Sequence, residues 1–217
     1  MRSRLFRPLV PLATLALLGA GVALAAPANA DPGPVEALQG SACPTNITEG
    51  STSTWCVDTL QAALRQLGFT LQVDGQFGPQ TVAAVKWVQT KAHLQNSSVG
   101  VDGQVGPVTK SWLVHFVEQQ SVDLGGECGL DLISHPDSGT AQAMITEGDT
   151  SGADHCTGYL QRSDNGGRSW YAVSGEHTES YGESVTTYAY ADSASQLEEV
   201  CGSSVTNSVN SGCTAAF

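Results

Sequence analysis

The pattern of hydrophobic and polar positions changes its period at about residue 120. Between residues 43 and 120, apolar side chains recur at the spacing of an α-helix. In VDTLQAALRQLGF they fall on one helical face, formed by Val57, Leu60, Ala63, Leu64 and Leu67. Gly68 follows as a helix stop. Residues 81–94 and 108–117 repeat this pattern, so we expect three helices in this part of the chain.

The second half of the chain has the pattern of strands. From Cys128 onward the composition shifts to Ser, Thr, Gly and Tyr. Short β-rich or alternating runs predict strands at residues 142–146, 157–162, 169–173 and 184–191. Residues 194–200 fit either a short helix or a strand. We expect a small, mostly antiparallel β domain with a sandwich-like arrangement.

One short motif occurs twice in the helical part. VDGQFGPQT at residues 73–81 recurs as VDGQVGPVT at residues 101–109, and the two copies are identical at seven of nine positions. Each copy holds an Asp-Gly turn, in which the Asp oxygen bonds nearby amides and the Gly adopts a positive φ. A Gly-Pro pair then places proline in the first turn of the next helix. The repeat predicts two duplicated turn-to-helix units.

Residues 1–30 are typical of a secretory signal peptide. A basic start, an apolar run and a small-x-small cleavage site follow one another in MRSRLFR, residues 9–26 and Ala28-Asn29-Ala30. A membrane anchor is the alternative, but one Pro and two Gly interrupt the run, and no basic cluster follows it. We therefore expect cleavage after residue 30, secretion, no membrane contact of the mature chain, and an unstructured lead-in over residues 31–42.

Acidic side chains outnumber basic ones. The chain has 21 Asp+Glu against 9 Lys+Arg, a formal charge of −12, and loss of the three arginines of the leader would make it −15. Because phosphate binding needs clustered Lys and Arg, this composition argues against a nucleic-acid partner. We expect a neutral, amphoteric or cationic ligand.

Six cysteines in a chain with a signal peptide indicate disulfides and an oxidising compartment. Cys43 and Cys56 enclose a short loop before the first helix, and closing it stabilises the fold by about 2–3 kcal/mol. Four cysteines remain and allow three arrangements. Of these we prefer the pairs Cys128–Cys156 and Cys201–Cys213.

Three segments in order carry a resemblance to a known family. Residues 57–69, 73–89 and 101–113 are similar to the motifs of the peptidoglycan-binding-domain-like family, a small three-helix module attached to many bacterial wall hydrolases and secreted proteins. The resemblance covers about residues 43–118 and implies a three-helix bundle with peptidoglycan, its glycan or its stem peptide, as the ligand. Val88 stands where the family usually has an aromatic residue, and the adjacent Trp87 is expected to compensate.

Two tryptophans and the repeated turns supply the candidate ligand-binding residues. Trp87 lies off the apolar stripe of its helix and is a candidate platform for a sugar face, the alternative being a position at the rim of the core. Trp112 is a weaker candidate. The motif itself is expected to be mostly scaffold, and its candidate contact residues are Asp74, Gly75, Phe77, Asp102 and Gly103.

No catalytic or metal-binding motif is found in the sequence, and we expect no catalytic residue, metal or cofactor. One alternative is a peptidoglycan hydrolase or peptidase whose site lies in residues 128–217, where His135, Asp137, His155 or His177 would converge around a metal. Another is a secreted recognition or inhibitor domain that binds a protein partner. SDNGGRSW at residues 163–170 resembles the Asp-box turn of β proteins, and we expect Ser163 and Asn165 to satisfy loop amides there.

These observations together predict two domains and a non-catalytic protein associated with the cell wall. A three-helix, peptidoglycan-binding-like domain would anchor an acidic β domain of unknown function to peptidoglycan. The expected bounds are residues 43–118 for the helical domain, 119–127 for a linker and 128–217 for the β domain.

Overall fold

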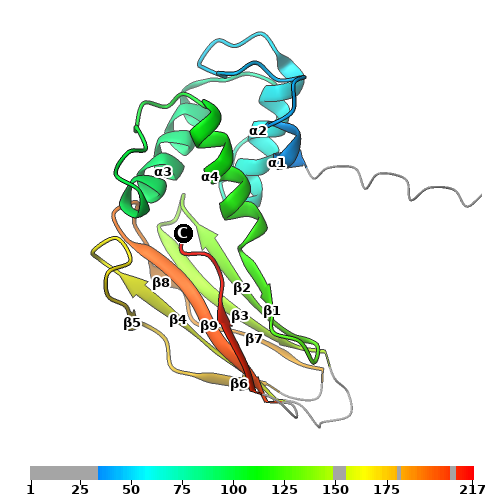
Figure 1. Cartoon of the computed structure of the whole chain (residues 1–217), viewed down its shortest axis with the longest axis vertical. Coiled ribbons are helices and arrows are strands. Elements are labelled where there is room, and N and C mark those ends of the chain that lie inside the picture. Colours follow the sequence, from blue (N-terminus) through cyan, green and yellow to red (C-terminus); the bar gives the residue numbers. More distant parts are fainter. Residues whose placement is uncertain (1–33, 149–154, 180–181, 206–208) are drawn as a thin grey trace, which may run out of the picture. The chain divides into compact units, whose positions relative to one another are not determined.

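The computed structural model describes residues 34–148, 155–179, 182–205 and 209–217 (Figure 1). Residues 32–217 form one compact unit. The predicted signal peptide lies outside the described residues. Within the described ranges, no helix combines the length and the apolar character that crossing a membrane requires.

The described residues of the N-terminal part form four helices. Three of them, α2 (Thr54–Gln66), α3 (Pro79–Gln95) and α4 (Pro107–Glu118), correspond to the helices that the apolar spacing predicts. A proline occupies the first turn of both α3 and α4, as the repeat predicts, and its missing N–H costs nothing at that position.

The fourth helix, α1 (Pro34–Ala37), lies in the segment predicted to be an unstructured lead-in. Val35 and Leu38 are both buried there, 3% and 0% exposed, and anchor the segment in the hydrophobic core. A single turn with two apolar residues is too short to show a helical period, which is why the sequence did not reveal it.

Two antiparallel sheets make up the C-terminal part (Figure 1). One has the order β1-β2-β3-β7, with β8 also paired to β3, and the other has the order β10-β9-β4-β5, with β6 also paired to β4. The strands of the first sheet are β1 (Ser121–Asp123), β2 (Cys128–His135), β3 (Thr140–Glu147), β7 (Ser184–Thr186) and β8 (Tyr190–Ala191). Those of the second are β4 (Cys156–Ser163), β5 (Tyr171–Ala172), β6 (His177–Glu179), β9 (Leu197–Val205) and β10 (Val209–Cys213).

The predicted strands are found, with several differences. The run at residues 169–173 is reduced to the two residues of β5. The run at residues 184–191 is split into β7 and β8. The ambiguous residues 194–200 lead into strand β9, not a helix. Strands β2, β6 and β10 are not among the predicted strands, although the alternating burial of β2 matches a strand with one buried face.

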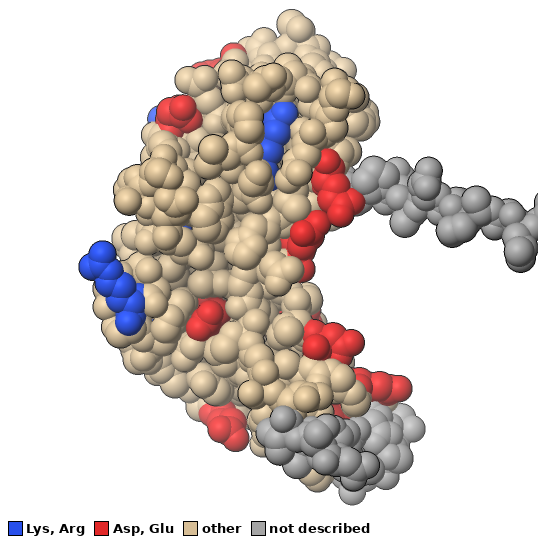
Figure 2. Space-filling view, in the orientation of Figure 1, with Lys and Arg blue, Asp and Glu red and all other residues tan. Residues whose placement is uncertain are grey.

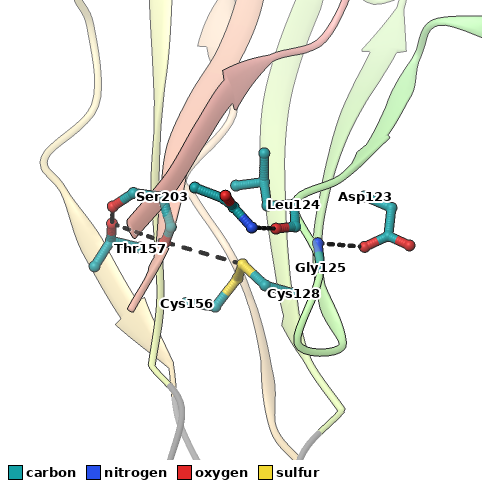
Figure 3. Close-up of a disulfide and its surroundings, with 8 residues drawn as sticks. Asp123, Leu124, Gly125, Cys128, Cys156, Thr157 and Ser203 are labelled. Carbon is teal, nitrogen blue, oxygen red and sulfur yellow. Dashed lines mark hydrogen bonds between the residues drawn. A yellow bond between two sulfur atoms is a disulfide. The ribbon is translucent and has the colours of Figure 1, made fainter. Parts of the chain in front are cut away.

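Glycines and a disulfide hold the two sheets together. A Cβ on Gly158 of β4 would lie 2.6 Å from Ile145 of β3 and 2.9 Å from Leu130 of β2, so only glycine allows this close approach. The disulfide Cys128–Cys156 joins β2 to β4, and Figure 3 shows it near Thr157 and Ser203. The other disulfides are Cys43–Cys56 and Cys201–Cys213, so all three are those that the sequence favoured.

The helices pack directly on the sheets. Strand β1 lies inside the predicted linker and pairs with β2. Gly68, at the end of α2, approaches β2 so closely that a Cβ would lie 1.8 Å from the Ser134 carbonyl oxygen. Gly166, in the turn after β4, lies equally close to α3, because a Cβ on it would be 2.4 Å from the carbonyl oxygen of Leu94. The helices and sheets therefore share a tight interface.

A buried charge cluster crosses this interface. Lys91 of α3 is fully buried, and its Nζ lies 2.7 Å from Asp192 Oδ1 and 2.9 Å from Glu198 Oε2. Arg162 of β4 donates from Nε to the other Glu198 oxygen at 2.8 Å. The Lys91 ammonium also stands 4.4 Å from the centre of the Trp87 ring. Two basic and two acidic side chains thus meet in the interior.

The first prediction concerns Lys91. Lys91→Met removes one cation and leaves Asp192 and Glu198 undercompensated in the interior, so the free energy of unfolding should fall by about 3–5 kcal/mol. Urea unfolding followed by fluorescence measures this loss. Lys86→Met, on the exposed side of the same helix, is the control and should change stability by less than about 0.5 kcal/mol. Equal losses in the two variants would contradict the structural role of the cluster.

The second prediction concerns pH. Burial, assisted by the neighbouring Asp192 carboxylate, raises the pKa of Glu198 from its ordinary 4.5 to about 7. Between pH 4.5 and about 7, Glu198 therefore keeps a proton in the folded chain that it releases in the unfolded chain. The stability linked to this proton is complete below about pH 4.5 and is lost as pH rises through about 7.

The slope for one proton is about 1.4 kcal/mol per pH unit at most. In Glu198→Gln this component of the pH profile should vanish, whereas in Glu118→Gln, at an exposed helical site, it should persist. Urea midpoints measured between pH 4.5 and 7.5 test this, and an unchanged slope in Glu198→Gln would contradict the assignment.

Candidate functional site

A buried glutamine of α2 organises the first repeated turn. Gln61 is 2% exposed, and its Oε1 accepts the N–H groups of Asp74 and Gly75 at 2.9 and 3.0 Å. Its Nε2 donates to Asp74 Oδ1 at 2.8 Å and to the Gln76 carbonyl at 3.1 Å. One side-chain amide thus satisfies both donors and acceptors of a tight turn.

The second turn is built in the same way from α3. Gln89 accepts the Gly103 N–H at 2.8 Å and donates to Asp102 Oδ1 at 2.9 Å and to the Gln104 carbonyl at 2.8 Å. Gln61 and Gln89 are separated in the sequence by the same interval as the two motifs. The repeat therefore includes the preceding helix, and aligning the chain with itself at this interval would have revealed the two glutamines.

The candidate residues of the motif serve these turns. Gly75 and Gly103 are buried with positive φ values of 67° and 79°, and Phe77 is buried in the core. Hydrogen bonds from Gln61 and the Gln76 backbone lower the pKa of Asp74. The Gln104 backbone N–H and Gln89 lower the pKa of Asp102 in the same way. Both carboxylates are accordingly held ionised as turn acceptors.

Trp87 is partly buried and does not stand out as an exposed platform. Its ring makes an edge contact with Phe69 at 5.6 Å and a tilted contact with Phe217 at 4.9 Å, and the Lys91 ammonium covers it as well. It borders a hollow of about 270 Å³ with Phe69 and Asp137. Trp112 is also partly buried, against Phe116 and His115. The alternative of a rim position describes Trp87 better.

Two small hollows open at the starts of α3 and α4, with volumes of about 210 and 200 Å³. Their linings correspond from one repeat to the next, because each contains the turn glutamine, the motif Asp, the Gly-Pro pair and the motif Thr. The two are not equivalent in their surroundings, because the hollow at α4 adjoins a larger one.

That neighbour is a hollow of about 530 Å³, and Pro107 lines both. We call the two hollows together the α4 groove. The larger one is lined by Gln39, Gly40, Ser41, Cys43, Thr45, Pro107, Lys110 and Ser111. The smaller one includes Asn46 and Val108, of which Val108 is 56% exposed. The groove is therefore lined by polar residues, by Lys110 and by one exposed apolar side chain.

Three links fix the loop that forms one wall of the α4 groove. The disulfide Cys43–Cys56 ties its start to α2. Ile47 and Val105 exchange two backbone hydrogen bonds, of 3.1 and 2.8 Å. Lys110 Nζ donates to the Pro44 carbonyl at 2.7 Å. A wall fixed in this way loses little conformational entropy when a ligand binds.

The candidate metal ligands of the β part lie on separate elements. His135 is exposed at the end of β2, His155 precedes β4, and His177 is on β6. Asp137 accepts the Thr70 N–H. Within the described residues, one group of His, Cys, Asp or Glu meets metal-ligand spacing, namely Glu199, Cys201 and Cys213, and its two cysteines form a disulfide.

The Asp-box-like turn has the structural role that the sequence predicts. Ser163 Oγ accepts the Gly167 N–H at 2.8 Å, and Asn165 Oδ1 accepts the Ser169 N–H at 3.0 Å. The turn packs against the end of α3 through Gly166. It helps to hold the helical part and the sheets together.

The third prediction tests the turn glutamines. Gln89→Leu keeps the side-chain volume but leaves the buried Gly103 N–H without its partner and the Gln104 carbonyl with only the 3.3 Å bond from Thr109, so stability should fall by about 2–4 kcal/mol. Gln80→Leu, at an exposed position of the same helix, is the control and should be nearly neutral. Thermal or urea unfolding measures both, and a neutral Gln89→Leu would refute the role given to this amide.

Comparison with known proteins found a family match for the helical part of the chain. No curated protein and no solved structure matches the chain. Residues 57–113 match the family model described as a "putative peptidoglycan binding domain". The matched segment begins in α2, ends in α4 and contains both glutamine-organised turns. It confirms that this part of the chain has the peptidoglycan-binding family signature that its repeated motifs indicate.

Proposed function

We propose that this chain is a secreted, non-catalytic protein that binds peptidoglycan with the α4 groove of its helical part. The observation that carries the proposal is the family match over residues 57–113. The matched segment contributes Pro107, Lys110 and the preceding turn to the α4 groove. The groove volume lies in the range usual for sites that bind small ligands or short chain segments.

The rest of the chain fits the same setting. Three disulfides are typical of proteins outside the reducing cytosol. On the face in Figure 2, acidic side chains form several patches and the few basic ones stand apart, which favours solubility and disfavours polyanionic partners. In this proposal the helices are the family's three-helix module with α1 added, and the sheets form a sandwich-like domain that the module anchors at the wall.

Sedimentation with purified sacculi tests this function. Residues 31–217 are used as a whole, because Lys91 shares its buried site with Asp192 and Glu198 of the second half. We expect the protein to pellet with sacculi, and soluble muropeptides not to rise above a protein-free control. Protein that stays in the supernatant contradicts binding. Released muropeptides contradict the non-catalytic role and favour the hydrolase alternative.

The fourth prediction places the binding surface. Val108→Asp puts a charge on an exposed apolar position of the α4 groove and should weaken sacculus binding about tenfold through the lost apolar contact. An acidic residue in the first turn of a helix does not harm its stability.

Val101→Asp is the matched control, because Val101 is 43% exposed in the same repeat but lines neither hollow. Binding isotherms of the two variants should separate, with Val101→Asp close to the unaltered chain. Equal weakening, or none in Val108→Asp, would place the binding surface elsewhere.

A further inference from the structure

Lys110 is a buried cation without a carboxylate partner. Lys110 is 5% exposed, although it lies on helix α4 at the surface of the module. An ammonium has three N–H donors, and one of them goes to the Pro44 carbonyl at 2.7 Å. Among the residues that the structure describes, no Asp or Glu forms an ion pair with Lys110, whereas Lys91, the other buried lysine, has two.

The hollow beside Lys110 is suited to an anionic group. Its lining contains Lys110, polar residues and glycine, and no acidic residue. Burial lowers the pKa of Lys110, because nothing nearby compensates its charge. A carboxylate placed there would restore that compensation, and its hydrogen bonds would be charge-assisted and only partly screened by water.

The net charge of the chain makes this site selective. A protein of formal charge −12 repels anions over most of its surface, so an anion is retained only where a local cation outweighs that field. The stem peptides of peptidoglycan end in a carboxylate and also carry amide groups, which match the polar wall of the hollow. The glycan strand offers mainly hydroxyls, for which a buried ammonium gives little advantage.

We propose that the larger hollow of the α4 groove binds the terminal carboxylate of a peptidoglycan stem peptide, with the Lys110 ammonium as its anchor. The inference rests on the proposed function and specifies which part of the polymer the groove recognises. Lys110 then has two roles, since one donor holds the loop at Pro44 and the others hold the ligand.

The fifth prediction is a comparison of two synthetic stem pentapeptides on unaltered residues 31–217. One peptide ends in the free acid and the other in the amide, and calorimetry or ligand-observed NMR measures their dissociation constants. The acid should bind about tenfold more tightly or better, as expected for a charge-assisted hydrogen bond. Equal affinities, or no binding of the acid, overturn the inference.

Variants locate the effect at Lys110. Lys110→Met should reduce the affinity for the acid to that for the amide, and Lys86→Met, at an exposed site of α3, should leave both unchanged. Because Lys110→Met also removes the bond to Pro44, its unfolding transition is measured in parallel. The acid-to-amide ratio on the unaltered chain decides the inference even if this variant unfolds.

Two further arms separate the remaining outcomes. Glycan strands stripped of peptides carry free carboxylates on their muramic acid, and tighter binding of these strands than of the peptide acid would overturn the inference by placing the carboxylate on the glycan. Sedimentation with sacculi is run alongside. If the chain pellets but does not distinguish acid from amide, this inference fails alone, and if it does not pellet, the proposed function fails first.

Discussion

The side-chain amide of Gln89 is the constraint on which the helical part most depends. A turn that reverses the chain between two helices leaves backbone donors and acceptors in the interior, and each of them is costly without a partner. Gln89 reaches from α3 and satisfies several of them at once. Gln61 does the same one repeat earlier. Because the amide fits one turn geometry, it also fixes where the following helix begins.

The position of the α4 groove follows from that start. The turn under Gln89 ends in Gly106-Pro107, and Pro107 lines both hollows of the groove. Lys110 lies one turn further along α4, where its ammonium meets the Pro44 carbonyl. The first turn makes the same start for α3, but the hollow there is lined by no lysine and by no part of a disulfide-fixed loop. The duplication thus gives two similar turn-to-helix units. The one at α4 differs because residues of the Cys43–Ile47 loop line its hollows.

The sequence predicted what depends on neighbouring residues. Helices α2, α3 and α4 follow from the apolar period, and the turns follow from Asp-Gly and Gly-Pro. It could not predict contacts between distant segments. The sequence left Trp87 open between an exposed platform and a rim position, because Phe217, which covers it, is far from it along the chain. The pairing of Lys91 with Asp192 has no local signal in the sequence either, because the two residues are far apart along the chain. The same holds for Lys110, whose partner Pro44 is in a loop without any period.

Helix α3 also explains why the module and the sheets form one unit. Gln89 and Lys91 are two positions apart, so they point to different sides of the helix. Gln89 serves the turn within the module, and Lys91 serves the carboxylates of the β part. Without the β part, the buried Lys91 ammonium would lose its carboxylate partners, and Trp87 would lose its contact with Phe217. The family match ends at residue 113, but the packing that stabilises the matched helices continues to Phe217. The segment that matches the peptidoglycan-binding family model is therefore packed against the β part of the same chain.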